Sequence, residues 1–149
     1  MGFSELGVVK NLFKMKLNPA IPTYGNPEYR GKCPRETAEQ VTCINWVKAQ
    51  YPQTYGKLIF HPKLDGKKSH AQIAKEKMEG VIAGVPDIVV PARVTGLFEI
   101  KRKDLTQSKW QPKQQDYLIT AKGQGAWVCV CLGHEAFMEA FREWVTVQS

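Results

Sequence analysis

The spacing of hydrophobic residues in the first third of the chain predicts a helix from about Pro34 to Gln50. Val41, Ile44, Val47 and Tyr51 recur every three or four residues, which places them on one helix face. An amphipathic helix of this kind packs its hydrophobic face against the rest of a domain.

Polar residues share that predicted buried face. Glu36 and Gln40 lie in line with Cys43 and Val47 on a wheel of 3.6 residues per turn. A carboxylate on such a face needs solvent, a partner or a metal ion beside it. Glu39 falls at the edge of the face and is the competing candidate for a functional acid.

Short hydrophobic runs predict the strands. Two β-branched runs, Asp87–Val90 and Leu97–Arg102, are separated by a segment short enough for a hairpin. Trp127–Leu132 has the pattern of a buried strand. Lys57–His61 predicts a further short strand after a turn.

Three more helices follow from capping signals and periodicity. Ser69 with Gln72 forms a capping box for a helix that runs to about Glu79. The other two are expected over 112–122, with a proline at the first helical position, and over 135–145. The order α-β-α-β-β-α-β-α predicts an α/β fold with a mixed sheet and helices on both faces.

The chain of 149 residues is long enough for one domain with a hydrophobic core. Residues 1–32 have several prolines and glycines with weak periodicity, so we expect an irregular N-terminal arm before a domain at 33–149. In the final helix, Phe137, Phe141 and Trp144 form a stripe interpreted as core, with a partner-binding surface as the alternative.

Composition indicates where the protein acts and what kind of partner it binds. No hydrophobic run approaches the roughly 20 residues of a membrane span, and the start of the chain lacks the pattern of a signal peptide. We therefore expect a cytoplasmic protein whose four cysteines are reduced. The formal net charge of +7 and pI near 9.3 favour a polyanionic partner such as nucleic acid.

The chemistry is concentrated in the predicted hairpin. Glu99 and Lys101 are two residues apart in a strand and so point to the same face. If the hairpin is centred near Arg93, Asp87 lies opposite Glu99. Two adjacent carboxylates repel each other, and a hard divalent cation such as Mg²⁺ or Mn²⁺ relieves that repulsion. With a lysine beside it on a basic protein, such a site suits cleavage of a phosphodiester.

At these residues the sequence resembles the PD-(D/E)xK nuclease superfamily, and within it the VRR-NUC family. The resemblance spans about residues 34–132 and rests on four motifs: Glu36-Thr-Ala-Glu-Gln40, Gly84-Val-Pro-Asp87, Leu97-Phe-Glu-Ile-Lys101 and Pro112-Lys-Gln114. It implies a restriction-endonuclease-like fold and metal-dependent cleavage of DNA. Stand-alone members come from phages and bacteria and are associated with branched DNA such as Holliday junctions.

The resemblance also implies roles for individual residues. Asp87, Glu99, the backbone carbonyl of Ile100 and Glu36 match metal ligands, and Lys101 matches the catalytic lysine. Gln114 matches a catalytic glutamine, although its neighbour Gln115 leaves that assignment open by one position. Gln40 follows the matched glutamate by one helical turn, where it can contact DNA.

Basic residues beside the predicted site are candidates for contacts with DNA phosphates: Lys67, Lys68, Lys103 and Lys113. His61 and His70 lack metal-ligand spacing and are interpreted as ordinary histidines.

We therefore expect an endonuclease that needs Mg²⁺ or Mn²⁺ and no nucleotide cofactor. It would act on branched DNA as a homodimer, because two symmetric incisions need two active sites, and in the host cytoplasm if a phage encodes it. The alternatives are a site-specific or nicking endonuclease on linear duplex DNA, and an inactive nucleic-acid-binding protein with the same fold.

Overall fold

The structure is a computed structural model that describes residues 15–62 and 68–149. Its centre is a four-stranded sheet in the order β1-β4-β3-β2. β4 (Trp127–Leu132) runs parallel to both β1 (Thr23–Tyr24) and β3 (Gly96–Lys101), whereas β2 (Ile88–Val90) is antiparallel to β3. The sheet is therefore mixed, as the sequence predicts.

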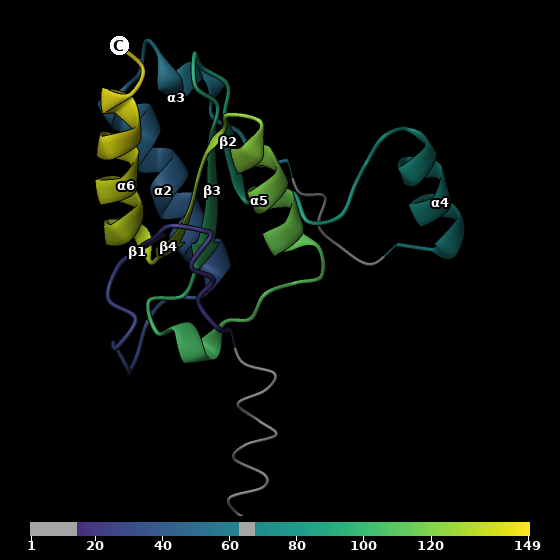
Figure 1. Ribbon diagram of the computed structural model, residues 1–149, viewed down its shortest axis with the longest axis horizontal. Coiled ribbons are helices and arrows are strands. Elements are labelled where there is room, and N and C mark those ends of the chain that lie inside the picture. Colours follow the sequence, from purple (N-terminus) through teal and green to yellow (C-terminus); the bar gives the residue numbers. More distant parts are fainter. Residues whose placement is uncertain (1–14, 63–67) are drawn as a thin grey trace, which may run out of the picture.

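Helices cover both faces of the sheet (Figure 1). α2 (Glu36–Gln50) and α6 (His134–Thr146) lie on one face, and α5 (Gln114–Gly123) lies on the other. Alternate residues of β3 supply the two cores, since Phe98 packs with the α2 and α6 side and Leu97 with the α5 side. The predicted α/β architecture is confirmed.

The aromatic stripe of α6 belongs to the core. Phe137, Phe141 and Trp144 are fully buried and pack around Phe98. The alternative that this stripe binds a partner is therefore wrong.

The turn of the β2–β3 hairpin is held by the end of α6. Trp144 Nε1 donates a hydrogen bond to the carbonyl of Val94 at 2.9 Å. The side-chain oxygen of Gln148 accepts one from the Val94 N–H at 3.0 Å. Both backbone groups of a turn residue are thus bound by the same neighbouring segment.

The strand predicted over Lys57–His61 is wrong for its first half. The structure has a short helix there, α3 (Tyr55–Leu58), and then a single β-bridge between Phe60 and Val89. Gly56 explains the difference, because a Cβ at this position would lie 2.6 Å from the Tyr51 carbonyl oxygen. The backbone turns tightly here instead of extending.

The expectation of an irregular arm over residues 1–32 needs correction for its described part. Thr23 and Tyr24 pair with β4, and the Val130 N–H donates to the Pro22 carbonyl at 2.9 Å. Met15 and Ile21 are buried in the core on the α5 side. Residues 15–32 are therefore part of the domain.

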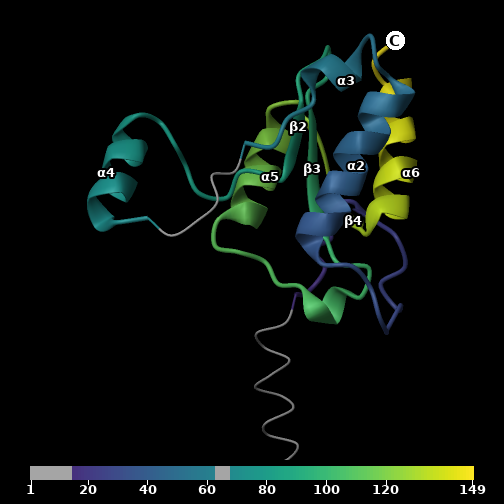
Figure 2. The same cartoon turned by 180° about the vertical axis from the view of Figure 1, so that it is seen from behind.

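Two smaller elements complete the fold: α4 (His70–Met78) and a 3₁₀ turn, η1 (Leu105–Gln107). Ser69 caps α4 by accepting the Gln72 N–H, as the capping box predicts. α4 projects from the body of the domain in both ribbon views (Figures 1 and 2). None of the helices in the described part of the chain has the length and apolar character needed to cross a membrane.

Candidate metal-dependent active site

The hairpin register brings the two predicted acids together. β2 and β3 pair Ile88 with Phe98 and Val90 with Gly96, so one further step places Asp87 opposite Glu99. The Asp87 carboxylate accepts a hydrogen bond from the Ile100 N–H at 2.9 Å. The predicted hairpin centre near Arg93 is confirmed, since these pairs are symmetric about that residue.

Glu99 lies where a charged carboxylate is unfavourable. Its side chain is 1% exposed, and its Oε2 atom is buried without a hydrogen-bond partner. Burial raises the pKa of this carboxyl well above its ordinary value, and the adjacent Asp87 raises it further, whereas Lys101 acts in the opposite direction. A buried acid with an unpartnered oxygen beside a second acid could hold a cation.

Lys101 lies on the same side of β3 and is also buried, with 2% of its side chain exposed. Its Nζ donates to the Lys109 carbonyl at 2.8 Å and to the Gln114 side-chain oxygen at 3.1 Å. The nearest oxygens of Glu36 and Glu99 are at 3.8 and 4.0 Å. An ammonium group has three N–H donors, so one remains to face these carboxylates or a bound phosphate.

Gln114 links these groups from the first residue of α5. Its amide nitrogen donates to Glu99 Oε1 at 3.3 Å, and its oxygen also accepts the Gln111 N–H. The neighbouring Gln115 instead accepts a hydrogen bond from Asn18. The geometry therefore selects Gln114 over Gln115 as the residue in the site.

A close backbone contact fixes the start of α5 against the loop before β2. Lys113 has a φ of 70°, and Gly84 has a φ of +87°. A Cβ at Gly84 would lie 2.4 Å from the Lys113 carbonyl oxygen, so only glycine fits. This contact holds the Gln114 helix beside the segment that leads to Asp87.

The structure separates the two glutamates of α2. Glu36 Oε1 accepts a hydrogen bond from Ser108 at 3.0 Å and faces Lys101. Glu39 is 2% exposed and bonds to the backbone N–H and Nδ1 of His134, at 2.5 and 2.7 Å. Glu36 therefore belongs to the site, whereas Glu39 caps the first turn of α6.

Sequence reasoning missed the loop that supports Glu36. Ser108 is buried, donates to Glu36 and accepts the Arg102 N–H at 2.9 Å. Asp104 organises the same loop by accepting hydrogen bonds from Thr106, Gly31 and Gln107. These bonds, led by the one from the Thr106 hydroxyl, lower the pKa of Asp104 to about 2. No pattern in the sequence marks Ser108, because it lies in a polar loop.

His61 lies beside the site and is a satisfied histidine. Its Nδ1 is 2.6 Å from the backbone carbonyl oxygen of Asp87. Within the described part of the chain, no three His, Cys, Asp or Glu side chains by themselves surround a metal position. Backbone oxygens and water would therefore complete any coordination shell.

The predicted DNA-contact residues are scattered. Gln40 is half-buried on α2, whereas Lys103 and Lys113 are exposed near the site, and Lys103 lies 4.5 Å from the Tyr29 ring centre. Lys68 is paired with Glu76 at 2.6 Å on the projecting segment. Lys67 lies outside the described residues.

Comparison with known structures supports this architecture. A solved structure described as "VRR_NUC domain protein" superposes with a TM-score of 0.61 at 22% identity, covering 78% of this chain and 92% of that chain. The fold is restriction-endonuclease-like. No protein-family model matches this restriction-endonuclease-like chain, and a comparison with curated proteins finds no match.

Proposed function

We propose that this protein is a VRR-NUC-type endonuclease that hydrolyses DNA phosphodiesters with Mg²⁺ or Mn²⁺. The observation that carries the proposal is the buried Glu99 carboxylate, which has one unpartnered oxygen and faces Asp87 across the hairpin. Lys101 offsets only part of the charge of these acids, since the pKa of Glu99 stays well above its ordinary value with the lysine in place.

The residues present suit a hard divalent ion. Asp87 and Glu99 would supply carboxylate oxygens, and the Ile100 carbonyl would be a further oxygen donor, whereas Glu36 faces Lys101 and would have to approach the ion. When bound, the ion would offset charge on the scissile phosphate and make a water molecule more acidic. The Glu36 side chain is 43% exposed, so it can adjust as substrate enters.

Lys101 and Gln114 prepare the site for negative charge. The Lys109 carbonyl and the Gln114 oxygen fix the Lys101 ammonium without neutralising it. An ammonium fixed in a buried position stabilises charge that develops on a phosphate, and it does so without reorganising during the reaction. The Gln114 amide nitrogen also donates to Glu99, so Gln114 is a positioning residue for both Lys101 and Glu99.

DNA is the proposed substrate class because the chain carries a net charge of +7 and exposes Lys103, two residues after Lys101, and Lys113, next to Gln114. Branched DNA, such as a four-way junction, is the preferred substrate, and two copies would make the paired incisions. Cleavage or nicking of linear duplex DNA is the alternative. A purely DNA-binding role is disfavoured, since clustered carboxylates weaken the binding of a polyanion.

The test compares purified wild-type protein with Asp87→Ala, Glu99→Gln and Asp116→Ala. Asp116 is an exposed acid on α5, so its variant is the matched control. Each protein is incubated with linear, flapped and four-way DNA in Mg²⁺, Mn²⁺ or EDTA. We expect cleavage by wild type and Asp116→Ala only, with a metal ion present and fastest on the junction.

Three results would contradict parts of this proposal. Cleavage that persists in EDTA, or in the Asp87→Ala variant, would exclude the metal mechanism. Equal rates on linear and four-way DNA would exclude selectivity for branched DNA. Binding of DNA without cleavage under every metal condition would favour the inactive binding protein.

A further inference from the structure

The projecting segment around α4 exposes an unusual amount of hydrophobic surface. We call residues 68–82 the arm. No residue of α4 is buried, and the arm exposes Ile73, Met78, Val81 and Ile82, with Met78 reaching 90%. An isolated helix of nine residues is marginal in water, because few internal hydrogen bonds offset its ordering cost. The arm therefore needs a packing partner.

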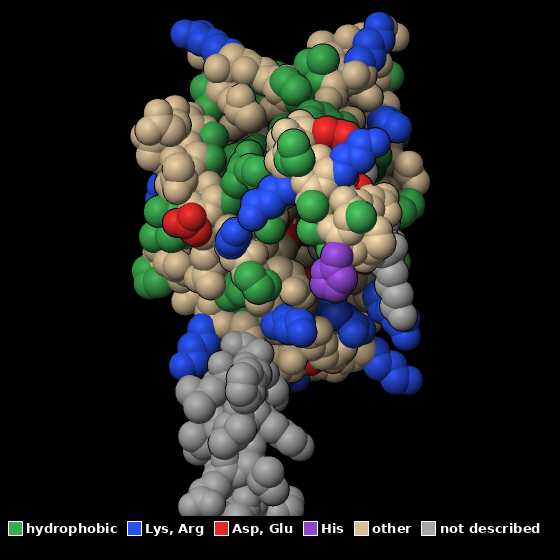
Figure 3. All heavy atoms as spheres, turned by 90° about the vertical axis from the view of Figure 1, so that its right-hand side faces the viewer, with side chains coloured by type: hydrophobic (Ala, Val, Ile, Leu, Met, Phe, Trp, Pro, Cys, Tyr) green, Lys and Arg blue, Asp and Glu red, His purple; other side chains and the backbone are tan. Residues whose placement is uncertain are grey.

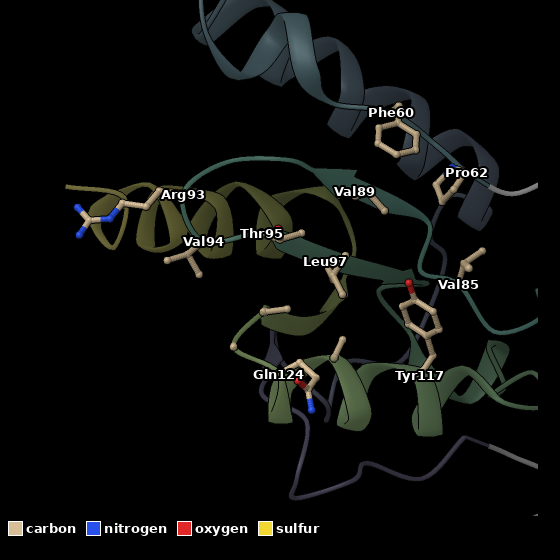
Figure 4. A pocket seen from close by; sticks show the side chains of 13 residues that line it. Phe60, Pro62, Val85, Val89, Arg93, Val94, Thr95, Leu97, Tyr117 and Gln124 are labelled. Atoms are coloured by element: carbon tan, nitrogen blue, oxygen red, sulfur yellow. The ribbon is translucent and has the colours of Figure 1, made fainter.

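A hydrophobic groove lies at the base of the arm, with a volume of about 490 Å³. Figure 4 shows α5 along one side, with Tyr117 and Gln124, and the β2–β3 hairpin along the other, with Val89 and Leu97. Phe60 stands at one end and is 46% exposed. Figure 3 views the molecule from the side on which the arm projects, and hydrophobic side chains are visible beside it.

The path of the chain connects the arm to the groove. Pro62 precedes the arm in the sequence and Val85 follows it, and both residues line the same end of the groove. The arm is thus attached at the rim of the surface that it could cover. A two-fold dimer in which each arm covers the groove of the other copy would be a self-complementary contact.

We infer that the arm of one copy docks into the groove of a second copy of this chain. Within the described residues, ten large hydrophobic side chains are exposed, and half of them lie on the arm or at the groove: Phe60, Ile73, Met78, Val81 and Ile82. The aromatic stripe of α6 is consumed by the core and is not available for association. These two surfaces are therefore the complementary pair that remains.

The charges of the arm favour a protein partner over nucleic acid. Lys68 is paired with Glu76 at 2.6 Å, and Lys75 lies 3.8 Å from Glu79. Most of the basic charge on the arm is therefore balanced within the arm itself, while its hydrophobic residues remain uncovered. Contact with a phosphate backbone needs the opposite arrangement.

Docking of two copies would bring together the two active sites that cleavage of a junction requires. This role of the dimer rests on the proposed function. The test of docking uses neither DNA nor metal, so the two proposals can fail separately. The catalytic-site variant Asp87→Ala should associate as wild type does, because Asp87 lies outside the arm and the groove lining.

Sedimentation equilibrium of the full chain measures the association. The arm variant is Met78→Asp with Ile82→Asp, whose side chains are 90% and 55% exposed in one copy. The groove variant is Ala121→Arg, checked for folding by near-UV circular dichroism. Val41→Asp is the matched control, since Val41 is 53% exposed on α2, across the sheet from the groove.

We expect wild type and Val41→Asp to sediment at about twice the monomer mass of 16.8 kDa. The arm and groove variants should weaken association by about 30-fold or more, as loss of a central hydrophobic contact does. A monomeric wild type at 100 μM, a dimeric arm variant, or equal loss in Val41→Asp would overturn the inference. Loss of DNA binding in the arm variant with unchanged sedimentation would overturn it too, and would assign the arm to nucleic acid.

Discussion

The two glutamates of α2 offer a sharp test, because alanine should lower mainly the stability at Glu39 and mainly the DNA cleavage at Glu36. In Glu39→Ala, the His134 N–H and ring nitrogen lose a buried, charged acceptor at the first turn of α6. A lost helix cap and a lost hydrogen bond to a charged group together cost about 2 kcal/mol. For a chain of this length, the unfolding temperature should fall by roughly 4–8 °C.

Glu36→Ala should behave in the opposite way. Its carboxylate is 43% exposed, so the ion pair with Lys101 at 3.8 Å adds little to stability after solvent screening. We expect the free energy of unfolding to change by no more than about 0.5 kcal/mol. DNA cleavage should fall severely, because the variant removes an oxygen donor from the site.

Urea unfolding and single-turnover cleavage of a four-way junction, measured on both variants, check this pair. Folded Glu39→Ala protein should retain cleavage at temperatures well below its midpoint. A stable but inactive Glu39→Ala together with an active Glu36→Ala would refute the assignment and reverse the roles of the two acids.

Three further predictions concern the site. Because Glu99 has a raised pKa in the folded state, its contribution to the stability of the metal-free protein should be fully present below the ordinary pKa of 4.5 and be lost as pH rises through the raised pKa. Melting curves in EDTA should show this loss of stability with rising pH, and Glu99→Gln should remove it. Mg²⁺ at 100 times its Kd should restore about 2.7 kcal/mol of stability at high pH. A wild-type stability that does not change with pH would contradict the prediction. Lys101→Met should slow single-turnover cleavage by about 10²–10³-fold while metal affinity by calorimetry persists, and an unchanged rate would remove Lys101 from the mechanism. Ser108→Ala should weaken metal affinity by about tenfold or more, with recovery in Ser108→Thr; failure of the threonine variant to recover would indicate a merely structural serine.

The sequence was most informative where function and local pattern coincide. The sequence placed Asp87 opposite Glu99 on the condition that the hairpin is centred near Arg93, and the structure has that register. Trp127–Leu132 is a strand with the predicted bounds, because its hydrophobic run is continuous and bounded by polar turns. Local periodicity determines such elements.

Other features depend on contacts between distant segments and have no local signal. β1 is two residues long, too short for any periodicity, and exists because β4 offers an open edge. On α2, the helix phase placed Glu36 on the buried face and Glu39 at its edge, whereas in the structure Glu39 is 2% exposed and the Glu36 side chain is 43% exposed. His134 and Ser108 make the choice, and they are 95 and 72 residues away in the sequence from their respective partners. The metal ion, the DNA substrate and the second copy stay predictions.

The hold of α6 on the hairpin turn has a consequence for catalysis at the other end of the hairpin. Val94 is fixed through both its N–H and its carbonyl by Gln148 and Trp144. A slip of one residue in an antiparallel pair turns every side chain to the opposite face, which would send Glu99 and Lys101 into the core beneath α2 and α6. Trp144 in the last turn of α6 and Gln148 just after it therefore fix the register of the hairpin, and the register determines which side chains point into the active site.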